Sequence, residues 1–425
     1  MADSMLALYA LALGAPAAAV GAIVGAQFIG VTCSVLFVAI AVERAGQRAS
    51  IIAGLVINAG AFVASAATPT WSLLVASRFA MGIGNSAWMV ARRTFIASTV
   101  PPRMRGRWNS LEGTVGKCFE IVTPAIGGAI ATYAGYRVIF WIAAAGTALA
   151  AMLVVAVFPR RGSAGGPYGV APAVGGSWPG RRELVRACAV REWRWLAPTV
   201  LASRMSLQAN NVLLTLRLVL TFEQSAIVVG GMVAVRNVTA VLGIAAAGFV
   251  IDAYGRRACG VPGLLLLAVG ILGTAAAPSV SHLWAVHAVL GVADGMVTTC
   301  LQTLESDLAP PESRTLFVAL YRVVNSFGNG VGPLLGGAAA HWSIEHGCLV
   351  AAVLALLGAA VYAVAGDETL TKPASPAEAH CTHDTLPADP ANQSGGAELA
   401  VLGVQALEEA PLRGWPVIDS RVPRV

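Results

Sequence analysis

Long apolar stretches recur along most of this 425-residue chain. Stretches of about 18 or more such residues can cross a lipid bilayer as helices, and they are unusual in soluble domains. Only 12% of the residues are charged, against about 25% in an average soluble domain. The apolar residues do not alternate at period two, which argues against a membrane β-barrel. The sequence therefore predicts an all-α membrane protein.

We expect eleven membrane-spanning helices, with edges where the apolar stretches end. They cover residues 17–40, 49–68, 72–99, 109–133, 138–158, 195–218, 226–250, 259–278, 282–307, 315–339 and 347–365.

A fixed spacing of 209 residues relates landmarks in the two halves of the chain. Several unrelated landmarks do not arise readily at one spacing by chance, so the chain is a duplicated unit. The pairs are Glu43 and Asp252, Gly82 and Gly291, Pro101-Pro102 and Pro310-Pro311, Pro124 and Pro333, and Gly127-Gly128 and Gly336-Gly337.

Each half has a short charged loop between two apolar helices. The second-half loop reads Gly-Phe-Val-Ile-Asp-Ala-Tyr-Gly-Arg-Arg over residues 248–257, and residues 39–48 form a weaker copy in which Glu43 replaces Asp and Gln47 replaces Arg. This duplicated pattern resembles that of the major facilitator superfamily of secondary transporters. The resemblance covers about residues 6–366. It implies a fold of two helical bundles related by pseudo-twofold symmetry, with a cavity between them.

The repeat also explains the odd number of spans. The segment 195–218 begins the second half, and its partner 209 residues earlier would cover −14 to 9. Because the family has twelve helices, we expect only the end of the first one here, Leu6 to Gly14. Two explanations stay open, a misassigned start or truncated sequence and a genuine eleven-helix protein.

Arginine is concentrated in the loops on one side of the expected bundle. Fifteen arginines lie in the loops 41–48 and 100–108, in the segment 159–194 and after the two second-half helices that end on this side, against two in the opposite loops. Excess arginine stays in the cytoplasm. We therefore expect a multi-pass protein of the plasma (inner) membrane whose charged loops and C-terminus are cytoplasmic.

The resemblance implies that the two charged loops latch the cytoplasmic side in one conformation. An acid near a helix end can meet the positive end of the backbone dipole, and arginine can pair with that acid. The alternative is a role in topology alone, which suffices for the degenerate first loop. The expected latch residues are Asp252, Gly255, Arg256 and Arg257, with Glu43, Arg44, Gly46 and Arg48 in the first loop.

A stretch rich in glycine and proline lies in the helix expected at 315–339. Glycines four residues apart allow close helix packing in lipid, and an internal proline removes one backbone hydrogen bond. The family carries this pattern in the fifth helix of proton-coupled exporters, whereas here that position keeps only the proline and the glycine pair. The expected packing residues are Gly328, Gly332, Pro333, Gly336 and Gly337, with Pro124, Gly127 and Gly128 in the first half.

Ionisable residues inside the expected spans are costly and are functional candidates. Glu120 lies about 15 Å into its helix, near mid-membrane, and Lys117 shares its face. The two either neutralise each other or take part in proton coupling. Asp294 is the second carboxylate, and its repeat partner Asn85 is a neutral near-isostere.

Three arginines complete the candidates for proton coupling or substrate binding. Arg78 matches the fourth-helix arginine that the family links to proton transfer, and snorkelling to the interface is the alternative. Arg204 and Arg322 are expected either to bind an anionic group or to hold the two acids.

Composition predicts four parts of the chain. The apolar stretches form the bundles, the segment between them begins rich in glycine and proline, and the tail lacks a spanning stretch. The cysteines include no Cys-x-x-Cys pair, and His380, Cys381 and His383 lack a complete ligand set, so no metal is expected. The parts are an N-terminal bundle (1–158), a cytoplasmic linker (159–194), a C-terminal bundle (195–366) and a disordered cytoplasmic tail (367–425).

The expected function is secondary transport by alternating access. Proton-driven export of a small organic molecule is the first hypothesis, and uptake of a small metabolite is the second. A non-transporting membrane sensor or scaffold derived from a transporter is the third. We expect a monomer whose partners are a small substrate, protons and the lipid bilayer, with no nucleic acid, cofactor or enzymatic activity. Fold resemblance does not name the substrate.

Overall fold

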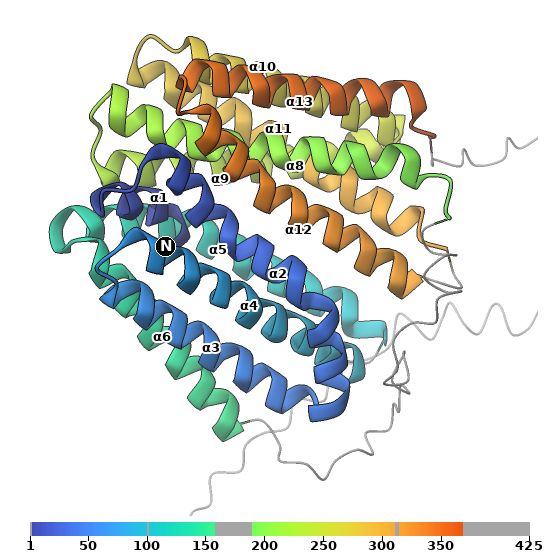
Figure 1. The fold of residues 1–425 in the computed structure, drawn as a ribbon. Coiled ribbons are helices and arrows are strands. Elements are labelled where there is room, and N and C mark those ends of the chain that lie inside the picture. The colour runs from blue at the N-terminus through green and yellow to red at the C-terminus, as the bar shows by residue number, and fades with distance from the viewer. Residues whose placement is uncertain (1, 100–101, 158–188, 311–313, 369–425) are drawn as a thin grey trace, which may run out of the picture. The chain divides into compact units, whose positions relative to one another are not determined.

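The computed structural model describes residues 2–99, 102–157, 189–310 and 314–368. Most of the expected linker and nearly all of the expected tail, including His380, Cys381 and His383, lie outside these ranges. The described chain forms twelve α-helices and one π-helical turn (Figure 1). They are α1 (Ala2–Ala12), α2 (Ala17–Ala45), α3 (Gln47–Ala67), α4 (Trp71–Thr99), α5 (Pro102–Ala134), α6 (Tyr136–Val157), α8 (Trp193–Leu216), η1 (Arg217–Thr221), α9 (Ala226–Tyr254), α10 (Arg256–Ala276), α11 (Val280–Asp307), α12 (Arg314–Ala339) and α13 (Ile344–Ala365).

All eleven expected spans are helical, which confirms the all-α prediction. Seven described helices are long and apolar enough to cross a membrane by length and composition alone. The edges differ from the prediction, because α2 ends at Ala45 instead of 40 and α5 begins at Pro102 instead of 109. The helices are longer because backbone hydrogen bonds continue through polar residues, whereas the apolar stretches end at the membrane–water interface.

The pseudo-twofold repeat is visible in the backbone. The bounds of α2 and α9 differ by 209 residues, and so do those of α3 and α10. The turn between the helices of each pair is a glycine at positive φ, 84° at Gly46 and 96° at Gly255, where other residues are strained. Each glycine amide donates to an equivalent carbonyl, that of Val42 or that of Ile251. The side with these two turns is referred to below as the hinge-loop side.

Two helix pairs make most of the contact between the halves, α2 with α12 and α5 with α9. Both pairs close on bare backbone. A Cβ added at Gly25 would collide with the carbonyl of Gly330, and one added at Gly230 would collide with that of Pro124. Small residues let helices in lipid approach this closely. We refer to these contacts as the glycine seams.

The first bundle is less covered than the second. In the second half α8 packs along α12 and α13, whereas the short α1 takes the equivalent place against α5 and α6. Phe119 on α5 and Leu149 on α6 are 63% and 53% exposed. Their repeat partners Gly328 and Gly358 pack against α8. One face of α5 and α6 is therefore open beyond the reach of α1.

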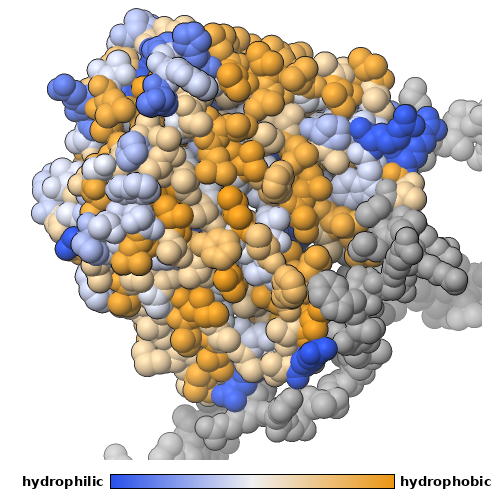
Figure 2. All heavy atoms as spheres, in the orientation of Figure 1, coloured by the Kyte–Doolittle hydropathy of each residue, from blue (hydrophilic) through white to orange (hydrophobic). Residues whose placement is uncertain are grey.

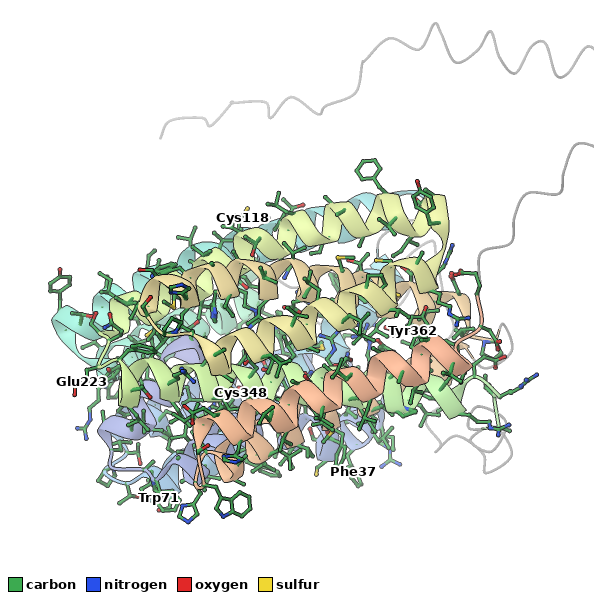
Figure 3. The ribbon with its side chains drawn as sticks, turned by 90° about the horizontal axis from the view of Figure 1, so that it is seen from above. Phe37, Trp71, Cys118, Glu223, Cys348 and Tyr362 are labelled. Carbon is green, nitrogen blue, oxygen red and sulfur yellow. The ribbon has the colours of Figure 1, made fainter. Side chains whose placement is uncertain are left out.

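Apolar side chains cover much of the outside. Figure 2 shows hydrophobic residues across the middle of one face and strongly hydrophilic residues at its margins. Leu242 and Phe249 on α9 are 62% and 79% exposed. Figure 3 labels Trp71 and Glu223 at one end of the helices and Tyr362 towards the other, the hinge-loop side. An apolar belt between polar ends suits a protein surrounded by lipid.

Candidate functional site

An ion pair lies in the interior of the second bundle. Arg236 on α9 donates from Nη2 to Oδ2 of Asp294 on α11 over 3.0 Å, and the two side chains are 13% and 23% exposed. Thr298 donates its hydroxyl to the other carboxylate oxygen over 3.1 Å. Arg236 also donates to the side-chain oxygen of Asn211 on α8. The pair sits near the middle of both helices, where charged groups are most costly and must be paired.

A chain of amide side chains continues from this pair. Asn211 donates to Gln208 over 2.7 Å, and both belong to α8. Gln208 donates over 3.4 Å to Asn329 on α12, which donates over 3.0 Å to Asn325. The interface of α8 and α12 is thus polar in its middle, although both helices belong to an apolar bundle.

Arg204 on α8 lies beside this network without joining it. With Ser203, Leu207 and Asp294 it lines a narrow gap between α8, α10 and α11 that is too small for a water molecule. It is close enough to interact electrostatically with the Asp294 carboxylate. Within the described residues it makes no hydrogen bond or ion pair, and its Nε atom is buried without a partner.

A second acid lies nearer the hinge-loop side. Glu305 on α11 is 7% exposed, and its Oε1 lies 3.7 Å from Nη2 of Arg322 on α12. Arg93 of α4 also interacts with it electrostatically, which links it to the other half. Tyr321, which is 1% exposed, lies near Glu305, Arg322 and Arg204. Its hydroxyl has no hydrogen-bond partner among the described residues.

In the first half the buried cation is Arg78 on α4. Its side chain is 2% exposed and donates to the carboxylate of Asp3 and to the amide oxygen of Gln27. Its Nη1 lies 3.0 Å from the sulfur of Met81. Arg78 therefore faces the bundle interior and does not snorkel to the surface.

The two halves differ at the position of the buried carboxylate. Asn85 replaces Asp294 in the first half and accepts a 3.4 Å hydrogen bond from Asn58. Leu267, which corresponds to Asn58, lines the gap beside Asp294. Only the second of these two equivalent positions can carry a titrating group.

Lys117 and Glu120 form a 2.5 Å ion pair on α5, with side chains 42% and 56% exposed. Asn237 on α9 donates to the backbone oxygen of Glu120 over 2.5 Å. The pair neutralises itself, as one of the two sequence interpretations has it. Both side chains are exposed in this chain, because this face of α5 is the open one.

The glycine- and proline-rich residues of α12 divide between two neighbours. Gly328, Gly332 and Gly336 face α8, and a Cβ added at Gly332 would lie 2.5 Å from the carbonyl oxygen of Met205. Gly337 and Pro333 face α2. In the first half, Gly128 and Pro124 face α9, and Gly127 is buried. One stretch therefore sets the spacing of α12 to both neighbours.

The second hinge loop is held by residues from two other helix ends. Arg256 donates from Nε to Asp307 at the end of α11 over 2.9 Å. The Glu368 carboxylate, beyond α13, accepts hydrogen bonds from the amides of Arg256 (2.9 Å) and Arg257 (3.0 Å). Asp252 is exposed. The acid that contacts the start of α10 is Glu368, and a carboxylate at this position complements the helix dipole.

The first hinge loop repeats one of these contacts. Arg48 donates to the backbone oxygen of Val155 near the end of α6 over 2.8 Å, as Arg257 does to that of Ala363 near the end of α13. Arg44 is exposed, and the side chain of Glu43 lies outside the described residues.

Removing the Glu368 carboxylate is expected to loosen the start of α10. In Glu368→Ala, trypsin should cut after Arg256 and Arg257 about fivefold faster, because a lost helix cap costs about 1 kcal/mol. Cleavage of the detergent-solubilised protein, followed by mass spectrometry, measures this. Asp367→Ala removes the neighbouring acid as the control. Equal acceleration in both variants would contradict a specific cap.

Several residues of these clusters escaped the sequence reasoning, among them Gln27, Asn211, Glu305, Tyr321, Asp307 and Glu368. One signal was available in the repeat. Gln27 corresponds to Arg236 and Arg78 to His287, at the same spacing of 209 residues. His287 is buried and close enough to Arg236 to interact electrostatically. Comparing polar residues across the repeat would have selected both clusters.

Two helical bundles joined at glycine seams, with ionisable residues in a lipid-facing protein's interior, form an architecture that known membrane transporters share. Solved structures support the fold. A bacterial homolog of the human lysosomal transporter Spinster, in an inward-facing and unoccupied conformation, superposes with a TM-score of 0.72 at 16% identity over 86% of this chain and 92% of its own. A D-xylose-proton symporter superposes with a TM-score of 0.62 at 18% identity over 87% and 93% of the two chains.

The sequence comparison gives the family. The Major Facilitator Superfamily model matches residues 1–197 and 196–423, and the chain belongs to this superfamily. A probable multidrug-efflux transporter of Mycobacterium tuberculosis (strain ATCC 25618 / H37Rv) is 32% identical over 129 residues. That alignment covers 30% of this chain and 27% of the relative, so this chain spans about a quarter of the relative's length.

Proposed function

We propose that this superfamily member is a proton-coupled transporter of a small organic molecule, with the Arg236–Asp294 pair as its coupling site. The ion pair between α9 and α11 carries the proposal. Its carboxylate can take up a proton, it is partly exposed, and the equivalent residue of the other half, Asn85, cannot titrate. Glu120 is less suited, because its exposed pair with Lys117 is already neutral.

The chemistry of coupling follows from the cost of unpaired charge. With Asp294 ionised, Arg236 is neutralised and the interior of the second bundle is stable. A proton on Asp294 removes the negative charge that is paired with Arg236, and leaves the arginine only neutral acceptors, the carboxyl group and the amide oxygen of Asn211. The protonated form therefore favours an arrangement that rehydrates the arginine or offers it another partner. Alternating access by rocking of the halves supplies such an arrangement.

Two directions of transport are candidates. Export driven by entering protons is the first, and the mycobacterial relative's name, a probable multidrug-efflux transporter, supports it. Uptake with the proton is the second, and the unpaired cation Arg204 beside Asp294 favours it.

Transport in vesicles tests the proposal. Proteoliposomes with an imposed pH gradient are given ethidium as the export probe or gluconate as the uptake probe. At one proton per substrate, each pH unit of gradient should support about tenfold accumulation of the transported probe. A protonophore should abolish this accumulation. Accumulation that persists after the gradient is collapsed rules out proton coupling, and no movement of any probe favours the sensor or scaffold hypothesis.

We further propose a monomer in the plasma (inner) membrane, with the hinge-loop side and the C-terminus in the cytoplasm. The excess of arginine in the loops of that side supports this orientation. Labelling of single cysteines placed at Arg44 and Arg257 tests it. Both positions should react only from the cytoplasmic side.

A further inference from the structure

Arginines outnumber acids around the two carboxylates of α11 that lie within the second bundle. Three arginines, Arg204, Arg236 and Arg322, meet two carboxylates, Asp294 and Glu305. Asp294 is paired with Arg236 at 3.0 Å, and Glu305 has Arg322 as its nearest ion-pair partner at 3.7 Å. Each acid is thus matched, and Arg204 is left over.

Arg204 is fixed by packing and not by polar contacts. Its Cβ would lie 3.0 Å from a Cβ added at Gly328, so the bare backbone of α12 passes directly over it. The residue lines the gap beside Asp294, which has to widen to admit a ligand, and its Nε is buried without a partner. Arg204 is partly buried, and holding a partly buried cation without a paired counterion costs free energy that a bound anion would relieve.

A second donor without an acceptor lies close by. The Tyr321 hydroxyl is buried and makes no hydrogen bond among the described residues. It is near enough to Arg204 to interact electrostatically, although it comes from a different helix. A hydroxyl can donate one hydrogen bond and a guanidinium several in a planar fork, and together these suit a carboxylate.

We propose that Arg204 and Tyr321 bind the carboxylate of a small organic anion, and that this anion is the transported substrate. The inference rests on the proposed transport function and names its substrate class. Gln208 and Asn329 offer amides for the uncharged part of the molecule, since their side chains line the same interface of α8 and α12.

The charges around Asp294 determine how the anion and the proton influence each other. Arg236 faces Asp294 from α9 and Arg204 from α8, whereas α10 contributes the apolar Leu267. An ionised Asp294 repels an anion on Arg204, and a protonated one does not. Proton and anion therefore favour each other's binding, which is the requirement for symport. Binding of this kind favours uptake over export.

Binding to the detergent-solubilised protein tests the proposal without any gradient. The probes are benzoate, lactate and gluconate, each matched with its primary amide, and the readouts are the unfolding midpoint and a titrated Kd. Carboxylates should stabilise the wild type and amides should not. Arg204→Gln should weaken carboxylate binding about 10- to 100-fold, because a hydrogen bond to a charged group contributes about 1.5–3 kcal/mol.

Three further variants sharpen the test. Arg204→Lys keeps the charge and should recover part of the affinity, and Tyr321→Phe should lose about fivefold. Arg194→Gln, at an exposed position of the same helix, should bind as the wild type does. Asp294→Asn should bind carboxylates more tightly and lose the pH dependence of binding. A pH dependence that survives in Asp294→Asn would point to His287 and overturn the coupling of anion to proton.

Other outcomes overturn the substrate class. Equal binding of acids and amides, wild-type affinity in Arg204→Gln, no binding of any carboxylate, or stabilisation by chloride alone would each do so. Failure of the vesicle experiment leaves carboxylate binding intact and removes only proton coupling. Failure of the binding experiment leaves coupling intact and removes only the anion.

Discussion

Replacing Asp294 with asparagine is expected to abolish proton-driven accumulation in proteoliposomes, down to the level of protein-free vesicles. The amide keeps the shape of the carboxylate but cannot take up a proton. The proton gradient can then no longer drive the transport cycle. Exchange of substrate across the membrane at equal concentrations should persist, because it needs no net protonation. Loss of accumulation with retained exchange is the signature to measure.

Two other acids show whether the effect is specific. Glu120→Gln decides between the carboxylates that the sequence singled out, and it should still respond to the gradient, because Glu120 is exposed and paired with Lys117. Glu223→Gln, in the loop before α9, is the control for altered surface charge. An Asp294→Asn protein that still accumulates substrate against a gradient would refute the proposed coupling site.

Replacing Arg236 with methionine is expected to destabilise the protein by about 3 kcal/mol, because it leaves the Asp294 carboxylate without its partner. Arg204→Met, in contrast, removes a cation that has no counterion, and it should lower the unfolding midpoint far less or raise it. The pair of variants compares a matched and an unmatched arginine in one bundle. Thermal unfolding in detergent provides the measurement.

The double variant Arg236→Met/Asp294→Asn gives the control. It removes both charges of the pair and should recover most of the stability lost in Arg236→Met. A midpoint as low as that of the single variant would mean that the arginine acts through packing and not through the carboxylate.

The sequence was sufficient for the fold because the physics of a bilayer leaves few options. Apolar length predicted the helices, and the spacing of 209 residues predicted which of them correspond. The agreement extends to single atoms, since Gly82 meets the carbonyl of Gln27 and Gly291 meets that of the equivalent Arg236. Helix ends were less predictable, because polar residues continue a helix beyond its apolar part.

The sequence predicted several residues of the candidate site but not the contacts among them. Asp294, Arg204, Arg322 and Arg78 stood out because charge inside a span is unusual. Their contacts were not predicted, because apolarity alone leaves the rotation of each helix undetermined. Asp294 pairs with Arg236, 58 residues away, whereas the sequence left Arg204 and Arg322 either to bind an anionic group or to hold the acids. Arg78 meets Asp3 and Gln27 across 75 and 51 residues.

The glycine seams have a consequence for how the halves can move. Where a carbonyl faces a glycine, as at Gly25 and Gly230, no side chain has to change rotamer when one helix slides along another. The contacts of Arg48, Arg257 and Glu368 each join helices of the same half, so they hold each bundle together and do not cross the seams. Each half is therefore expected to move as a rigid body, with the displacement taken up along the seams between α2 and α12 and between α5 and α9.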